Sequence, residues 1–298
     1  MIPHNQPHWR SLLYVPANAP RFIDKAHERG ADALILDLED SVPMSEKPSA
    51  RKALPTIIPR VGQSGADVLV RINRPLRLAV QDLEAAVLPG VSALVITKVD
   101  GASHVRLLDE LVGELEVERR IPKGRLRFIL IVETPQAWLS MREIFAASPR
   151  NAAAILGSED FSLECDAAPS DESLLMPKQQ LIIHAHASGL LPLGFISSIA
   201  KFSDPEKLLV MAQRSRSFGF AGATCIHPSQ VIAANQAFMP NAAEFEQAQR
   251  IVEAFELAER EGRGAISFEG QMVDAPVVAR ARRQLKIART NPYDPQKS

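Results

Sequence analysis

The sequence is poor in cysteine and has almost no net charge. Its 298 residues include only two cysteines, Cys165 and Cys225, too few for a disulfide framework or a four-thiolate zinc site. The 34 Lys and Arg residues nearly balance the 35 Asp and Glu residues, for a formal net charge of −1. A nucleic-acid-binding domain normally carries a strongly basic face. We therefore expect a cytoplasmic protein that binds no nucleic acid, while a local anion site stays compatible with this balance.

Long apolar runs are also missing. The uncharged segment 179–200 is interrupted by glutamine, histidine, glycine and proline residues, whereas a transmembrane helix needs about 20 predominantly apolar residues. Residues 1–10 are polar and contain no apolar core of a signal peptide. We therefore expect no membrane partner.

Short apolar runs are what the chain has instead, and they recur along most of its length. Most are continuous rather than alternating, which is typical of parallel strands covered on both faces. The eight predicted strands are 11–16, 33–39, 67–73, 93–99, 127–133, 151–157, 192–197 and 223–228.

Longer segments with helical patterns separate these runs and follow the last of them. The predicted helices include 20–29, 47–60, 102–118, 135–147, 244–261 and 276–289. Eight β–α units in about 230 residues favour a (β/α)₈ TIM barrel, and an open doubly wound sheet is the alternative. We expect a catalytic barrel domain over 1–237 and a C-terminal helical extension over 238–298, which carries the glycine-bearing segment 262–274 and serves as a lid, an oligomerisation arm or both.

Polar and ionisable residues follow most of the predicted strands. The active site of a (β/α)₈ barrel lies at the carboxyl ends of the strands, so these side chains are expected to converge on one face. The residues at these positions are Asp37, Glu39, Asp40, Arg71, Asn73, Lys98, Glu133, Glu159, Asp160 and His227.

Glu133 and Asp160 are candidate ligands of a divalent metal ion. They follow consecutive strands, and two carboxylates in one barrel mouth repel each other unless a cation lies between them. Oxygen ligands of this kind suit Mg²⁺. Arg71 would bind a substrate carboxylate or a developing enolate oxygen. Ion pairs that only solubilise the barrel mouth are the alternative interpretation, because structural ion pairs gather in the same places.

An ordered set of motifs resembles the citrate lyase β-subunit family of the HpcH/HpaI aldolase superfamily. The resemblance covers roughly residues 10–285, and the order of the motifs rather than any one of them makes it specific. The motifs are RSLLYVP, LDLEDSVP, KPSAR, VRIN, ITKV, IVETP, GSEDF, GFAGATCIHPSQ and EGQMVDAPV.

This resemblance implies a (β/α)₈ barrel, a bound Mg²⁺ ion (with Mn²⁺ as the alternative) and a CoA thioester as substrate. By position, Glu133 and Asp160 match the metal ligands of the family, and Arg71 matches its active-site arginine. Asp274 matches an acidic catalytic residue that family lyases bring from a neighbouring subunit on a C-terminal lid. An N-cap of the helix predicted from residue 276 is the alternative role of Asp274.

The other expected site residues bind substrate or orient those that do. The expected substrate-binding residues are Arg71, Glu133, Ser158, Glu159, Arg21 and Lys25. The last two match the region near the CoA phosphates. The acids expected to orient the arginine or metal-bound waters are Asp37, Glu39 and Asp40.

The resemblance predicts a Mg²⁺-dependent carbon–carbon lyase. It would cleave a 3-hydroxy-3-carboxyacyl-CoA, of the malyl-, citramalyl- or citryl-CoA type, into a 2-oxo acid and an acyl-CoA. A CoA-thioester hydrolase and a malate-synthase-like condensation are alternatives at the same site. A CoA-independent hydroxy-oxo-acid aldolase and a subunit of a citrate lyase complex are further alternatives. A homo-oligomer, a trimer or hexamer, is expected because the lid would come from a neighbouring subunit.

Two short segments depart from the family pattern. Thr97 stands where family members often have proline, and residues 193–195 read LGF where many members have an aspartate. Both changes leave Glu133, Asp160 and Arg71 in place. They therefore concern the acyl group of the substrate rather than the general chemistry.

Overall fold

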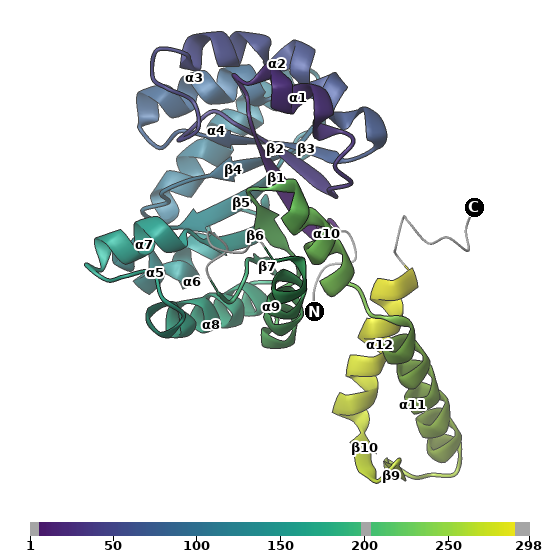
Figure 1. Ribbon diagram of the computed structural model, residues 1–298. Helices are drawn as coiled ribbons and strands as arrows, with labels where there is room; N and C mark the ends of the chain where they lie inside the picture. The colour runs from purple at the N-terminus through teal and green to yellow at the C-terminus, as the bar shows by residue number, and fades with distance from the viewer. Residues whose placement is uncertain (1–5, 198–203, 290–298) are drawn as a thin grey trace. The chain divides into compact units, whose positions relative to one another are not determined.

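Eight parallel strands form a nearly closed barrel in the computed structural model, which describes residues 6–197 and 204–289. The strands pair in chain order from β1 to β7, and β8 pairs with β1. A bridge between Leu193 and Gly222 joins β7 to the segment that leads into β8. Helices surround the strands (Figure 1). The predicted (β/α)₈ TIM barrel is thus confirmed, with further helices after it.

The strands begin and end close to the apolar runs of the sequence. They are β1 (Ser11–Pro16), β2 (Ala33–Asp37), β3 (Asp67–Ile72), β4 (Val91–Ile96), β5 (Arg127–Val132), β6 (Asn151–Leu156), β7 (Leu191–Leu193) and β8 (Ala223–Cys225). Most have five or six residues, whereas β7 and β8 have three each. The barrel is therefore closed by its two shortest strands.

The helices of the barrel unit lie between the strands, with a short 3₁₀ helix at Gly62–Ser64. They are α1 (Pro20–Ala26), α2 (Lys47–Val61), α3 (Leu76–Ala86), α4 (Ala102–Glu118), α5 (Pro135–Leu139), α6 (Met141–Phe145), α7 (Ser158–Glu164), α8 (Asp171–Ala187), α9 (Pro205–Phe218) and α10 (Pro228–Ala237). The single helix predicted over 135–147 is wrong, because the backbone of Ser140 leaves helical geometry and separates α5 from α6.

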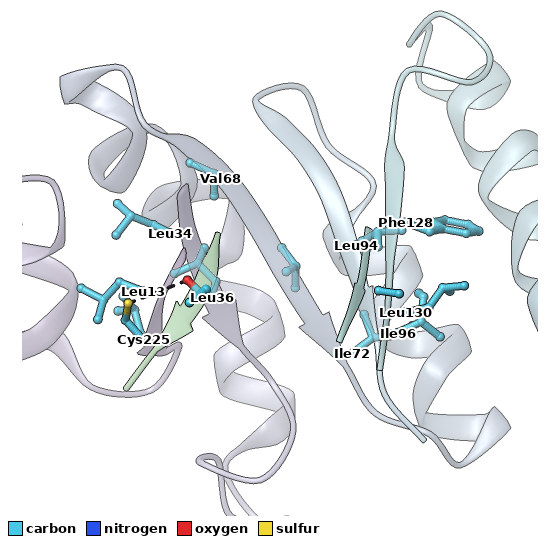
Figure 2. Close-up of a cluster of buried hydrophobic side chains, with 14 of the residues drawn as sticks. Leu13, Leu34, Leu36, Val68, Ile72, Leu94, Ile96, Phe128, Leu130 and Cys225 are labelled. Atoms are coloured by element: carbon cyan, nitrogen blue, oxygen red, sulfur yellow. Dashed lines mark hydrogen bonds between the residues drawn. The ribbon is translucent and has the colours of Figure 1, made fainter. Parts of the chain in front are cut away.

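Successive side chains of each strand point alternately into the barrel and out toward the helices. Leu12, Ile35, Val95 and Ile129 belong to one buried cluster inside the barrel. Figure 2 shows side chains of the second, larger cluster outside the strands. Its labelled members are Leu13, Leu34, Leu36, Val68, Ile72, Leu94, Ile96, Phe128, Leu130 and Cys225. Because both faces are buried, each strand reads as a continuous apolar run.

A buried ion pair fastens the amino ends of two strands. Arg150, directly before β6, binds the carboxylate of Glu116 on α4 at 2.7 Å, and both side chains are almost fully buried. Glu116 also accepts hydrogen bonds from the backbone N–H groups of Gly124 and Leu126, which precede β5. These bonds hold the pKa of Glu116 below its ordinary value, although burial alone would raise it.

The chain divides into two compact units, Met1–Phe238 and Met239–Ser298. The second unit contains α11 (Ala242–Arg260), β9 (Ala265–Phe268), β10 (Gln271–Asp274) and α12 (Ala275–Arg289). The two strands form an antiparallel hairpin, whose two turn residues, Glu269 and Gly270, have positive φ as a type I′ turn requires. The glycine-bearing segment of the sequence is therefore ordered by a hairpin. Among the described helices, none is long and apolar enough to cross a membrane.

Candidate functional site

The candidate site lies at the carboxyl ends of the barrel strands and continues the inward-facing side of each strand. Ile35, Leu69 and Ile131 belong to the buried cluster inside the barrel. Two residues further along the chain, the side chains of Asp37, Arg71 and Glu133 lie on the same face. Asp37 and Arg71 belong to β2 and β3, and Glu133 directly follows β5. The alternation that buries an apolar layer thus also turns these three ionisable groups toward the barrel axis.

These side chains line a cavity of about 640 Å³. This volume lies within the range of about 300–1,000 Å³ that is common for small-molecule sites. Its wall has an ionisable part and an apolar part. The ionisable side chains are Asp37, Asp40, Arg71, Glu133, Glu159, Asp160, Lys178 and Tyr14, and the apolar ones include Ile131, Ile155, Leu193, Phe195, Phe220 and Ile226.

Arg71 is held in a fixed orientation by Asp37. Its Nε and Nη2 donate to the two carboxylate oxygens of Asp37 at 2.7 and 2.6 Å, and its guanidinium carbon lies 4.8 Å from the ring centroid of Tyr14. Burial alone would raise the pKa of Asp37, but the hydrogen bonds and charge of Arg71 lower it below the ordinary value. The pair is therefore ionised, and its geometry leaves Nη1 of Arg71 for other partners.

A second set of charges connects β2 with the end of β4. Nη1 of Arg71 lies 3.0 Å from Glu39, and Nζ of Lys98 donates to the same carboxylate at 2.7 Å. Asp40, which is exposed, lies 3.8 Å from Arg71 and 3.6 Å from Lys98. Burial raises the pKa of Glu39 despite these two cations. The structure thus brings Glu39 and Asp40 against Arg71, where the sequence places positioning acids.

Glu133 and Asp160 form the acidic part of the cavity. Glu133 follows β5 and is buried, and Asp160 lies in the first turn of α7, directly after β6. The pKa of Glu133 is raised to about 8, chiefly by burial. The backbone N–H of Lys98, which donates to it, acts in the opposite direction, and the charge and hydrogen bonding of Asp160 contribute to the increase. The side chain lies against Gly157, where an added Cβ would be 2.4 Å from Cγ of Glu133.

This pair fits a magnesium ion better than a metal with many protein ligands. Among residues 6–197 and 204–289, no group of three or more His, Cys, Asp or Glu side chains is arranged to hold a metal. Mg²⁺ commonly takes one or two carboxylates and completes its shell with water and substrate oxygens. A cation between Glu133 and Asp160 would also offset the repulsion and burial that raise the pKa of Glu133.

The remaining predicted residues lie in three places. Ser158 and Glu159, at the start of α7, line the cavity. Arg21 and Lys25 lie four residues apart on α1 and are exposed; α1 follows the carboxyl end of β1. Asp274 belongs to the second unit, where its carboxylate accepts a hydrogen bond from the backbone N–H of Val277 at 3.3 Å and so caps α12.

Sequence reasoning missed two ionisable residues of the cavity wall, Tyr14 and Lys178, and the pairing of Lys98 with Glu39. Tyr14 is a β1 residue on the inward face, and the alternation of that strand predicts this orientation. Lys178 is buried on α8, where Leu174, Leu181 and Ile182 are also buried. These apolar residues lie three or four positions away from Lys178. Their helical spacing was the signal that placed this lysine on the inward side.

The comparisons with known proteins agree with this geometry. The model of the family described as HpcH/HpaI aldolase/citrate lyase matches residues 10–228. The chain belongs to this family. Citrate lyase subunit beta of Leuconostoc mesenteroides subsp. cremoris is 31% identical over 285 residues, which span 95% of this chain and 94% of the relative. The predicted resemblance to citrate lyase β subunits is thus confirmed.

Two further relatives of the chain differ in what their names describe. A (3S)-malyl-CoA thioesterase of Cereibacter sphaeroides is 33% identical over 288 residues, which span 96% of each chain. The structure of CitE from Mycobacterium tuberculosis, in complex with magnesium, acetoacetate and coenzyme A, matches with a TM-score of 0.74 and 30% identity over 93% of this chain and 97% of that one. These relatives thus include a citrate lyase subunit, a malyl-CoA thioesterase and a protein solved with magnesium and coenzyme A.

Proposed function

We propose that this protein is a Mg²⁺-dependent carbon–carbon lyase. Its substrate is a 3-hydroxy-3-carboxyacyl-CoA, and its products are a 2-oxo acid and an acyl-CoA. The observation that carries the proposal is the pair formed by buried Glu133 and half-buried Asp160 beside the oriented guanidinium of Arg71, in one cavity. The CitE structure with magnesium, acetoacetate and coenzyme A supports the choice of metal and of ligand.

Each residue has a separate task in this reaction. Glu133 and Asp160 hold the metal ion, which supplies Lewis acidity toward the substrate's carboxylate and hydroxyl oxygens when it is bound. Arg71, fixed by Asp37, stabilises the oxyanion charge that develops as the C–C bond breaks. The hydroxyl proton passes to solvent water and the hydroxyl carbon becomes the carbonyl of the 2-oxo acid, while the electrons of the C–C bond pass to the thioester enolate. Asp274 then delivers a proton to the enolate carbon.

The resemblance to family lyases, in which a C-terminal lid comes from a neighbouring subunit, is the basis for proposing that Asp274 acts in trans. We assign its carboxylate to the cavity of a neighbouring subunit in a homo-oligomer, so the hairpin segment acts as a lid. An Arg71→Ala variant and an Asp274→Asn variant, each inactive alone, should regain activity when their subunits are exchanged. If the subunits exchange but activity is not recovered, Asp274 acts in the cavity of its own chain.

Substitution of the acidic pair tests the proposed function directly. Glu133→Ala and Asp160→Ala should each abolish Mg²⁺-dependent cleavage of malyl-, citramalyl- and citryl-CoA. Each substitution removes one of the two carboxylates that would hold the ion, and the single carboxylate that remains is not expected to hold it. Glu164→Gln is the matched control, since Glu164 is an exposed acid on the same helix as Asp160. Full activity of either alanine variant in the presence of EDTA would refute the proposal.

Thioester hydrolysis is the second candidate, and the malyl-CoA thioesterase relative favours it. The products separate the two reactions when malyl-CoA is supplied. A lyase yields glyoxylate and acetyl-CoA, whereas a thioesterase yields malate and free CoA. Chromatography of the quenched reaction distinguishes these four compounds.

A further inference from the structure

Lys178 is a buried cation of the cavity wall that the proposed reaction does not use. It lies on α8 with 3% of its surface exposed, and it lines the same cavity as Arg71 and Glu133. Its Nζ donates to the backbone carbonyl of Ile196 at 3.1 Å. An ammonium group has three N–H donors. Across the described parts of the chain this is the one hydrogen bond that Lys178 makes, and it makes no ion pair.

The two cations of the cavity wall differ in this respect. Arg71 is neutralised by Asp37 and Glu39 at short range. Burial lowers the pKa of Lys178 to about 8, although the charges of Asp171 and Glu159 act in the opposite direction. Asp171 already accepts a hydrogen bond from Oγ of Ser197 at 2.7 Å. A buried charge without a close counter-ion is costly, and a bound anion would offset that cost.

The barrel topology places the two cations on opposite sides of the cavity. Arg71 is on β3, whereas Ile196, the partner of Lys178, follows β7. Strands four positions apart in a ring of eight lie across from each other. Ile131 and Ile155, on the strands between them, contribute apolar surface to the cavity. The acidic pair lies between the two cations in strand order, because Glu133 follows β5 and Asp160 follows β6. A ligand that binds at this pair and also reaches Lys178 would therefore carry two anionic groups separated by carbon.

The geometry assigns Lys178 to a second anion-binding subsite, which recognises an additional carboxylate on the 2-oxo acid part of the substrate. This inference rests on the proposed function: the first carboxylate of the oxo acid binds with the metal at Glu133 and Asp160, and the second binds Lys178. The substrate class is then a CoA thioester whose cleavage gives a dicarboxylic 2-oxo acid. The CoA phosphates are a poorer match for this subsite, because several charges need more cations than one enclosed ammonium group.

Pyruvate and oxaloacetate provide a matched pair of probes, since they differ only by one carboxylate on the methyl carbon. Calorimetric titration of the Mg²⁺-loaded protein should give roughly 10- to 100-fold tighter binding of oxaloacetate, as expected for a hydrogen bond between charged groups. Lys178→Met keeps the length of the side chain and removes the charge, so it should abolish this difference. Lys178→Arg should retain most of it. Lys207→Met, at an exposed lysine of α9, is the control and should retain all of it.

The outcomes separate this inference from the proposed function. If wild-type protein shows no preference, or if folded Lys178→Met keeps the preference, the subsite is refuted while lyase activity stands on its own assay. If the preference depends on Lys178 but no CoA thioester is cleaved, the lyase proposal fails and the subsite stands. Trapping of pyruvate on Lys178 by borohydride would assign the residue a covalent role and overturn the ionic one.

Discussion

The strongest quantitative prediction concerns Glu133, whose ionisation should destabilise the metal-free protein. Its pKa is about 8 in the folded chain, against an ordinary value of 4.5, chiefly because the carboxyl is buried. Below pH 4.5 the group is protonated in both states and stability is unaffected. Between pH 4.5 and 8 the unfolded chain releases this proton while the folded chain retains it, so the free energy of unfolding falls as the pH rises.

The size of the effect follows from the two pKa values. Each pH unit between them corresponds to about 1.4 kcal/mol, so the loss of stability across the window is at most roughly 5 kcal/mol. Glu133→Gln keeps the shape of the side chain and an oxygen that can accept from the backbone N–H of Lys98, but it cannot ionise. The variant should therefore be more stable than wild type at pH 8 and should lose this advantage near pH 5.

Urea denaturation in EDTA, at intervals from pH 5 to pH 8, measures this difference. The free energy of unfolding of the variant minus that of wild type should increase by roughly 4 kcal/mol over these three pH units. Mg²⁺ should then stabilise wild type at pH 8 and leave Glu133→Gln unchanged, because metal binding requires the ionised carboxylate. Glu164→Gln, the exposed control, should follow wild type throughout. Parallel pH profiles of wild type and Glu133→Gln would refute the reasoning.

Three other substitutions test separate parts of the structure. Asp274→Asn keeps the oxygen that caps α12 but removes the acid. The kcat should therefore fall by roughly 100-fold or more, while the melting temperature stays unchanged. A fully active variant would exclude Asp274 as the proton donor. Gly157→Ala places a Cβ 2.4 Å from Cγ of Glu133 and should weaken Mg²⁺ binding in calorimetry, whereas unchanged affinity would contradict this placement of Glu133. Glu116→Gln removes the fully buried counter-charge of Arg150, which keeps Asp109 as its second ion-pair partner, and should cost about 3 kcal/mol in urea denaturation. A loss below about 1 kcal/mol, as for an exposed pair, would show that Arg150 finds other compensation.

Much of the barrel could be predicted from the sequence because its strands are buried on both faces. Each of the eight apolar runs overlaps a strand of the structure, and the polar residue after a run marks the site. The break at Ser140 could not be predicted, because Pro135 opens a helix and the following residues keep an apolar pattern. The break depends on how α5 and α6 pack, which is tertiary information.

The site was predictable where strand alternation determines it and obscure where packing does. Asp37, Arg71 and Glu133 follow from counting two residues beyond an inward-facing apolar side chain. The bidentate contact between Arg71 and Asp37 depends on the register of β2 and β3, in which these two residues are partners. Lys178 reaches the cavity from a helix distant in sequence from Arg71, so its role required the assembled barrel.

The unequal strand lengths of the barrel suggest how new substrates could arise in evolution without loss of chemistry. Arg71 and Glu133 extend from six-residue strands, whose long hydrogen-bond ladders resist displacement. Lys178 is attached through Ile196 beside β7, and both β7 and β8 have three residues. A segment with fewer ladder hydrogen bonds opens locally at a lower free energy. Substitutions on the β7–β8 side of the cavity are therefore expected to disturb Arg71 and Glu133 less than substitutions on the β3–β5 side.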